Sequence, residues 1–232
     1  MMSEPREAAP ALHQLVDYAP PPHRGLDIVH ADDSFLIVNK PSGLLSVPGR
    51  GERFHDSMVS RVMLEFPQAL TVHRLDMQTS GLLVLALGPL AHRELSELFQ
   101  ARQVHKRYVA QVDGLMSADQ GEVALPLITD WPNRPRQKVD EVGGKPAFTR
   151  WQVLARDALQ SHTRVALEPV TGRSHQLRVH MMSIGHAILG DPLYASAEVR
   201  AQAGRLLLHA AELKLPHPRT GEWVHVTSPT PF

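Results

Sequence analysis

One aspartate in a short polar segment is the residue of this chain best suited to chemistry. Asp76 lies two positions after Arg74 within residues 73–81 (HRLDMQTSG), a segment that leads directly into the apolar run Leu82 to Leu87. A carboxylate that a rigid scaffold holds in a loop can act as a nucleophile or as a general base. The structural alternative is an aspartate that caps a turn or pairs with Arg74.

The apolar run after Asp76 predicts the element that holds this loop in place. Its six residues are too few to cross a membrane and suit a strand buried on both faces. Gly81 permits another chain segment to approach closely, and Thr79 and Ser80 can bond the amides of a turn. We therefore expect Asp76 in a loop that a buried strand positions.

Composition allows a sizeable core and excludes several chemistries. The chain has 232 residues, of which 43% are hydrophobic, so it can form one large or two small domains. It has no cysteine, which excludes thiolate nucleophiles, disulfides and zinc bound by cysteine. No apolar run is long enough to predict a helix that spans a membrane. These features are compatible with a protein of the cytoplasm.

The net charge is zero, but the basic residues are unevenly distributed. With 24 basic and 24 acidic residues, the chain lacks the basic excess of a generic nucleic-acid-binding protein. Residues 98–112 and 169–190 nevertheless contain no acidic residue, and a third basic cluster follows Trp131. A neutral protein can in this way present one basic face. Ordinary solvated charge is the alternative.

The order of the predicted elements indicates an α+β fold with a mixed, largely antiparallel sheet flanked by helices and loops. Strands outnumber helices and do not alternate strictly with them, which argues against a doubly wound fold. Strands are predicted over residues 26–30, 35–39, 82–87, 106–112, 123–128, 148–154, 163–168, 206–215 and 222–227. Helices are predicted over residues 58–66 after the capping residues Asp56 and Ser57, over 90–99, and over 173–184 with Thr171 as cap.

Residues 26–232 are predicted to form a single domain. Residues 1–25 contain five prolines and no apolar signal core, and they are predicted to be a mobile extension, with Leu12, Leu15 and Val16 as candidates for docking. The polar and basic residues 130–145 predict an exposed loop or a loose hairpin.

Motifs of other enzyme classes are missing. The chain has 14 histidines but no His-Glu-x-x-His pair, and the spacing of His175 and His180 does not match one helix face. Glycine-rich phosphate loops and a Gly-x-Ser-x-Gly elbow are also absent. The sequence therefore predicts no metal, no nucleotide cofactor and no serine hydrolase.

Five blocks, in order, resemble the motifs of RluA-type pseudouridine synthases. They are Asn39–Leu44, His73–Gly81, Lys106–Ala110, Thr171–His180 and Arg205–Ala210. The resemblance covers about residues 27–227. Further similarity to the dual-specificity branch of this family lies in residues 47–50, 130–135 and 194–196; Ala195 departs from the glycine of many relatives, at a position away from the chemistry.

The resemblance implies an isomerase that detaches uracil from C1′ of a ribose in RNA, turns it and rejoins it through C5. Such a reaction needs no external reactant, no cofactor and no metal. The implied substrates are a uridine of a tRNA anticodon loop and a hairpin-loop uridine of 23S rRNA, with a monomer as the default state. Too few residues precede the first strand for an S4-like domain, so RNA affinity must come from the catalytic domain.

The resemblance also assigns roles to side chains. Asp76 would act at C1′, at the C2′ proton or at C6, and the sequence leaves these possibilities open. Arg178 would keep Asp76 ionised, while Leu177 would help to exclude water. Tyr108 would stack on the uracil, and Arg74 would fill the place of the flipped nucleotide. The structural alternatives are a surface arginine for Arg178, a core tyrosine for Tyr108 and, for Arg74, an ion pair that shapes the loop.

Basic side chains on the proposed RNA-binding face are expected to contact phosphates: Arg102, Lys106, Arg107, Arg134, Arg136, Lys138 and Arg173. Two other classes of protein remain as alternatives. A glycoside or nucleoside hydrolase would usually need a second carboxylate, and between His73 and Glu94 the chain offers only Asp76. A non-catalytic RNA-binding module would need the basic face but not Asp76.

Overall fold

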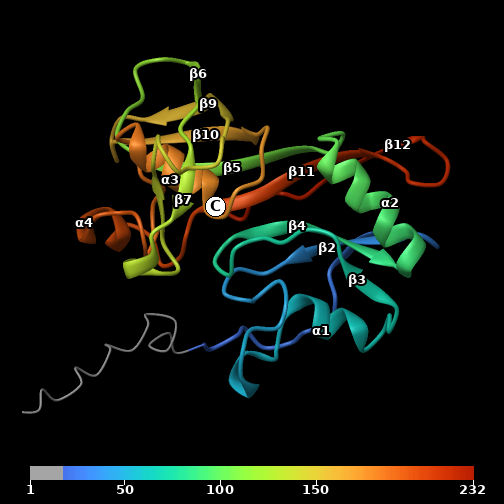
Figure 1. Cartoon of the computed structure of the whole chain (residues 1–232). Helices are drawn as coiled ribbons and strands as arrows, with labels where there is room; N and C mark the ends of the chain where they lie inside the picture. The colour runs from blue at the N-terminus through green and yellow to red at the C-terminus, as the bar shows by residue number, and fades with distance from the viewer. Residues whose placement is uncertain (1–17) are drawn as a thin grey trace, which may run out of the picture.

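The computed structural model describes residues 18–232 (Figure 1). The strands are β1 (Ile28–Ala31), β2 (Phe35–Lys40), β3 (Ala69–Thr71), β4 (Ser80–Leu87), β5 (His105–Asp113), β6 (Gln120–Val123), β7 (Leu127–Thr129), β8 (Gln137–Val139), β9 (Thr149–Asp157), β10 (His162–Pro169), β11 (Leu208–Pro216) and β12 (Trp223–Thr227). The helices are α1 (Met58–Met63), α2 (Pro89–Gln100), α3 (Gln176–Ser183) and α4 (Ala197–Ala201), with short 3₁₀ turns η2 (Glu52–Phe54) and η3 (Trp131–Asn133).

One large sheet runs through the described part of the chain. Its strand order is β1-β2-β4-β11-β5-β10-β9-β6, with β3 beside β4 and β12 beside β11. Within residues 18–232 its strands pair antiparallel except β4 with β11. In Figure 1, β2, β3, β4 and α1 form one side of the molecule, and β6, β9, β10 and α3 form the other. The predicted α+β class with a largely antiparallel sheet is confirmed.

The parallel pair of β4 and β11 joins these two sides. Ser80 is paired with His209, and Gly81 with Ala210. Gly81 has φ +110°, and a Cβ at this position would collide with the Ala210 backbone. Only glycine meets both demands without strain, so the close approach expected at Gly81 is confirmed.

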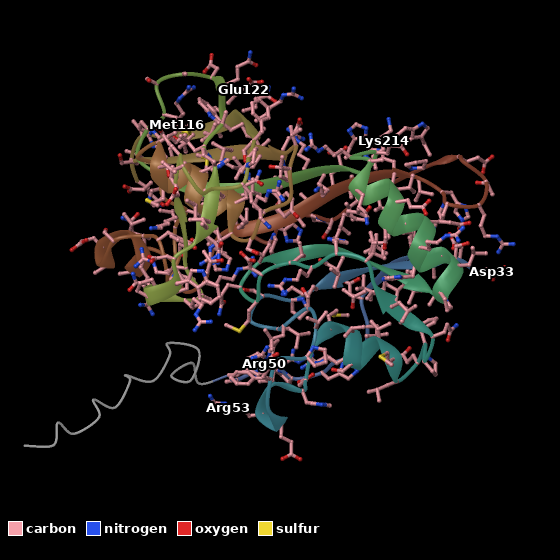
Figure 2. All side chains as sticks on the ribbon, in the orientation of Figure 1. Asp33, Arg50, Arg53, Met116, Glu122 and Lys214 are labelled. Carbon is pink, nitrogen blue, oxygen red and sulfur yellow. The ribbon has the colours of Figure 1, made fainter. Side chains whose placement is uncertain are left out.

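Burial of β4 on both faces is also confirmed. Leu83 packs with Val62 of α1 in one core cluster, and Val84 packs with Leu95 of α2 in another. Figure 2 shows side chains filling the space between the ribbons, with these labelled charged residues at the exposed periphery: Asp33, Arg50, Arg53, Glu122 and Lys214. The Asp76 loop therefore leads into the most deeply buried strand of the sheet.

Several predicted element boundaries are wrong, and the helix predicted over residues 58–66 ends at Met63. The strand predicted over residues 123–128 is two strands, β6 and β7, because Pro126 lies between them and has no N–H to donate to a ladder. Thr171 does not cap α3. Its hydroxyl donates to Gln176 and accepts from the amide of Phe148, so it ties the loop before α3 to the start of β9. His175 is the N-cap residue of α3.

The capping prediction for α1 is confirmed for one of its two candidates. Ser57 is the N-cap and forms a reciprocal capping box with Ser60. Asp56 instead pairs with Arg61 at 2.7 Å.

The stretch just before β1 packs on the domain. Tyr18 is buried, and its hydroxyl donates to the Asp56 carbonyl at 2.8 Å and accepts from the Leu45 amide at 3.0 Å. The expectation of a mobile extension as far as residue 25 is therefore corrected at Tyr18, because this aromatic ring gains by burial. Residues 1–17, including the docking candidates Leu12, Leu15 and Val16, lie outside the described residues. No helix within residues 18–232 is long and apolar enough to cross a membrane.

Candidate active site

A cleft of about 610 Å³ lies between the Asp76 loop, α2, β5 and the loop that leads into α3. The three predicted catalytic side chains, Asp76, Tyr108 and Arg178, all line it. Five other side chains with a role predicted from the sequence also line it: Arg74, Arg102, Lys106, Arg173 and Leu177. The fold thus brings together residues that are far apart in the sequence.

The loop after β2 fixes the backbone on both sides of Asp76. The Ser46 hydroxyl donates to the Leu75 carbonyl at 2.7 Å and accepts from the Leu75 amide at 3.0 Å. The Gly43 amide donates to the Met77 carbonyl at 2.9 Å. The backbone on both sides of Asp76 is therefore fixed, which keeps the Asp76 side chain directed into the cleft.

A buried lysine also holds this loop in place. Lys40 is fully buried, and its Nζ donates to the carbonyls of Pro41, Leu44 and Met77 at 2.9, 2.6 and 3.0 Å. Burial lowers the pKa of Lys40 to about 7, although the nearby Asp76 carboxylate opposes this shift. The motif around Lys40 is visible in the sequence, but the sequence gives no sign that the side chain points inward.

Arg178 joins two carboxylates. It donates to Oδ2 of Asp76 at 3.1 Å and makes a two-pronged contact with Asp191 at 2.8 and 2.7 Å. Its side chain is 3% exposed, and that of Asp191 is 1% exposed. Burial opposes the charge of Arg178, but the bonds to Asp191 and the charge of Asp76 outweigh it and raise the pKa of the guanidinium. Arg178 is thus no surface arginine, and Asp191 aims it at Asp76.

An aromatic residue and a histidine complete this network. The guanidinium carbon of Arg178 lies 5.0 Å from the ring centre of Tyr194. The Tyr194 hydroxyl lies 2.6 Å from Nδ1 of His175, and Nε2 of His175 lies 3.9 Å from Oδ1 of Asp76. The sequence blocks that contain Tyr194 and His175 are recognisable, but sequence reasoning assigns neither residue a role.

Strand β5 divides its residues between two faces. Lys106 and Tyr108 line the cleft, whereas Arg107, between them, points away and lies 3.9 Å from Glu212 on β11. Burial, together with the charge of Asp76, raises the pKa of Tyr108, so its hydroxyl is neutral at physiological pH. A neutral aromatic ring beside a carboxylate suits a reaction on a sugar whose flat base stacks on the ring.

Comparison with known proteins identifies the family. The model of the RNA pseudouridylate synthase family matches residues 34–183. The chain belongs to this family. It is 52% identical over 218 residues to the dual-specificity RNA pseudouridine synthase RluA of Pasteurella multocida (strain Pm70), and 53% identical over 218 residues to that of Escherichia coli (strain K12). Both alignments cover 94% of this chain and 99% of the relative.

Solved structures agree with this assignment. Human RNA Pseudouridylate Synthase Domain Containing 1 has a TM-score of 0.77 at 29% identity, covering 92% of this chain and 87% of that chain. Human RNA Pseudouridylate Synthase Domain Containing 4 has a TM-score of 0.69 at 26% identity, covering 88% of each. The chain is therefore an RNA pseudouridine synthase, an isomerase. The alternatives of a hydrolase and of a non-catalytic RNA-binding module find no support.

Three basic residues predicted to bind RNA lie on a separate part of this synthase, the β7–β8 arm, which we define as residues 127–139. The Arg134 guanidinium lies 4.6 Å from the ring centre of the exposed Trp131, and Lys138 lies 3.9 Å from Asp140. These residues do not line the cleft. Arg136 lies 5.5 Å from the ring centre of Tyr194, so it links the arm to the Arg178 network.

No metal centre is evident in the described part of the synthase. Among residues 18–232 no group of three histidine, aspartate or glutamate side chains is arranged to hold a metal ion. His180, for example, bonds Thr149 and the Leu125 carbonyl at 2.9 Å each. The expectation of a reaction without a metal or another cofactor stays a prediction.

Proposed function

We propose that this pseudouridine synthase modifies two kinds of RNA: a uridine in a tRNA anticodon loop and a hairpin-loop uridine of 23S rRNA. The support is the similarity to relatives that are named dual-specificity enzymes and that align over 99% of their length. Chemical mapping of pseudouridine in RNA from cells with and without this gene tests the proposal. Loss of one site in tRNA and one in 23S rRNA is the expected result, and loss in only one class of RNA would contradict dual specificity.

In the proposed reaction, Asp76 is the catalytic carboxylate. The bond between C1′ and N1 breaks, the uracil turns, and a bond forms between C1′ and C5. The proton on C5 leaves and N1 gains one, so the product is an isomer of the substrate. The observation that carries this role is the contact of Asp76 with the buried Arg178 inside the cleft that Tyr108 also lines. Action at C1′, at the C2′ proton and at C6 all remain compatible with it.

The other cleft residues have supporting roles in this proposal. Tyr108 stacks on the uracil and keeps the detached base from leaving, while Leu177 excludes water from the carboxylate. A uridine within an RNA stack must first be flipped out, which costs a few kcal/mol. Arg74 is exposed at the cleft, and in the proposal it fills the vacated place and contacts neighbouring phosphates.

RNA is held, in this proposal, by basic residues at the cleft and on the β7–β8 arm. Lys106 and Arg173 bind phosphates at the cleft, and Arg134, Arg136 and Lys138 bind them on the arm. Arg107 contributes least, because it faces away from the cleft toward Glu212. We also propose that the synthase acts as a monomer in the cytoplasm, where its RNA substrates are; sedimentation of the purified protein and cell fractionation test these two points.

A further inference from the structure

The histidine that precedes α3 faces the free side of the Asp76 carboxylate. His175 lines the cleft, its side chain is 13% exposed, and its backbone is left-handed with φ 55°. Arg178 holds Oδ2 of Asp76, whereas Nε2 of His175 lies 3.9 Å from Oδ1. The two oxygens of the carboxylate therefore have different surroundings, and only one of them has a direct hydrogen bond from Arg178.

The contact with Tyr194 favours the tautomer of His175 that carries its proton on Nε2. The Tyr194 hydroxyl accepts a hydrogen bond from the Gln137 amide at 2.8 Å, so its own hydrogen is free to be donated to Nδ1 of His175, 2.6 Å away. Burial lowers the pKa of His175, although Asp76 opposes the shift, so the ring is neutral at pH 7. With Nδ1 as acceptor, the proton of the neutral ring is on Nε2, which faces Asp76.

The gap between His175 and Asp76 suits one bridging oxygen atom. A separation of 3.9 Å is too long for a direct hydrogen bond, but an oxygen beside the line can lie about 2.8 Å from both atoms. This oxygen must accept a hydrogen bond from Nε2–H and donate one to the carboxylate. A hydroxyl group does both, whereas a carbonyl oxygen of uracil only accepts.

The 2′-hydroxyl of the target nucleotide meets this requirement. It lies on the carbon next to C1′, the carbon from which the uracil is detached. We infer that His175 and Asp76 together bind the 2′-hydroxyl of the target uridine, and that His175 is thereby a substrate-contacting residue that selects ribose over deoxyribose. The inference rests on the proposed function, because it needs Asp76 at the ribose. It also gives Tyr194 a role as the residue that sets the tautomer of His175.

The test combines a variant of the enzyme with a variant of the substrate. His175→Asn is suitable because asparagine tolerates the left-handed backbone, while its shorter side chain leaves the 2′-hydroxyl without the donor. The value of kcat/KM is measured for wild type and His175→Asn, on RNA with uridine and on RNA with 2′-deoxyuridine at the target position. Nucleosides are separated chromatographically after digestion, so both products are detected.

The expected result is a loss that depends on the sugar. Wild type should prefer the ribose substrate by about fivefold or more, the contribution of about one hydrogen bond. His175→Asn should lose about this factor on the ribose substrate and less than about twofold on the deoxyribose substrate. Tyr194→Phe, which keeps the ring beside Arg178 but lacks the hydroxyl, should show an intermediate preference. Arg173→Ala is the matched control: it should weaken both substrates equally and leave the preference unchanged.

Equal losses on both substrates would overturn the inference, since a purely structural histidine would slow both reactions alike. Where wild type does not turn over the deoxyribose substrate, dissociation constants are compared instead, for wild type and His175→Asn on each of the two RNAs. Equal losses of affinity for both RNAs would then overturn the inference. An active Asp76→Asn variant would instead overturn the proposed role of Asp76. An inactive Asp76→Asn variant together with equal losses in His175→Asn would overturn only the 2′-hydroxyl site.

Discussion

Arg178→Leu is expected to weaken the fold and to slow the reaction, for two separate reasons. The stability loss comes from Asp191, which is 1% exposed and would be left as a buried charge without its partner. Removing one member of a buried ion pair costs about 3–5 kcal/mol of the free energy of unfolding. Asp191 also accepts the amides of Leu193 and Tyr194, at 2.8 and 3.1 Å, so we expect the lower end, about 3 kcal/mol.

The loss of rate comes from Asp76. This carboxylate would lose a charge-assisted hydrogen bond from a rigidly held donor, and the loss of one such preorganised group costs about 100-fold in turnover. RNA affinity should change little, because the Arg178 side chain is only 3% exposed. The variant should therefore affect turnover far more than binding.

A second variant separates the two effects. In Arg178→Leu/Asp191→Asn the neutral amide oxygen can still accept the two backbone amides, so most of the lost stability should return while turnover stays low. Urea unfolding measures the stability, and single-turnover kinetics at a temperature where both variants are folded measures the rate. A double variant no more stable than Arg178→Leu would refute the role of Asp191, and a wild-type rate in Arg178→Leu would refute the role of Arg178.

Three further predictions concern other parts of the molecule. Asp76→Asn should lower turnover at least about 1,000-fold with RNA affinity nearly intact, because an amide is neither nucleophile nor base; substantial turnover by this variant in a single-turnover assay would contradict the role of Asp76. Burial lowers the pKa of Lys40 to about 7, so between about pH 7 and 10 the unfolded chain binds a proton that the folded chain has released. As the pH rises through that window, the free energy of unfolding of wild type should increase relative to that of Lys40→Met by up to about 1.4 kcal/mol per pH unit. Urea unfolding measures this difference, and a difference that does not change with pH would contradict the lowered pKa of Lys40. Replacing Arg134 and Lys138 by alanine should reduce the slope of log affinity against log salt by about 1.5 and leave the single-turnover rate at saturating RNA unchanged. Arg136 is left in place because it contacts the Tyr194 ring. An unaltered slope would show that RNA is bound mainly at the cleft.

The parts of the fold that are local in sequence could be predicted from it. The alternation and turn residues around Asp32 predict the β1–β2 hairpin, and the serine before the apolar positions of α1 predicts its cap. The short elements β3 (Ala69–Thr71) and α4 (Ala197–Ala201) were not predicted, because a run of three to five residues carries little periodic signal. The break between β6 and β7 could have been predicted from Pro126, because a proline interrupts a strand even where the β-branched residues around it favour one.

The site could be predicted only in part, because its supporting contacts are long-range. Asp76, Tyr108 and Arg178 are identifiable from motif resemblance alone. The burial of Lys40 and the pairing of Arg178 with Asp191 depend on which side of a strand or helix faces the interior. The sequence of α3 does not indicate this side, because polar and apolar residues among positions 176–181 are buried alike. A helix without a polar face has no amphipathic pattern from which to infer direction.

The separation of Asp76 and Arg178 in the sequence explains why the sheet junction matters for the chemistry. The two residues are 102 positions apart, and they come from opposite sides of the parallel pair β4–β11. Gly81 allows the backbones of this pair to approach, and β11 is also paired with β5, which carries Tyr108. A side chain at Gly81 would therefore push apart the halves that hold the carboxylate and its guanidinium, although residue 81 itself does not line the cleft. In this molecule the precision of the site rests on a backbone contact as much as on the charged side chains.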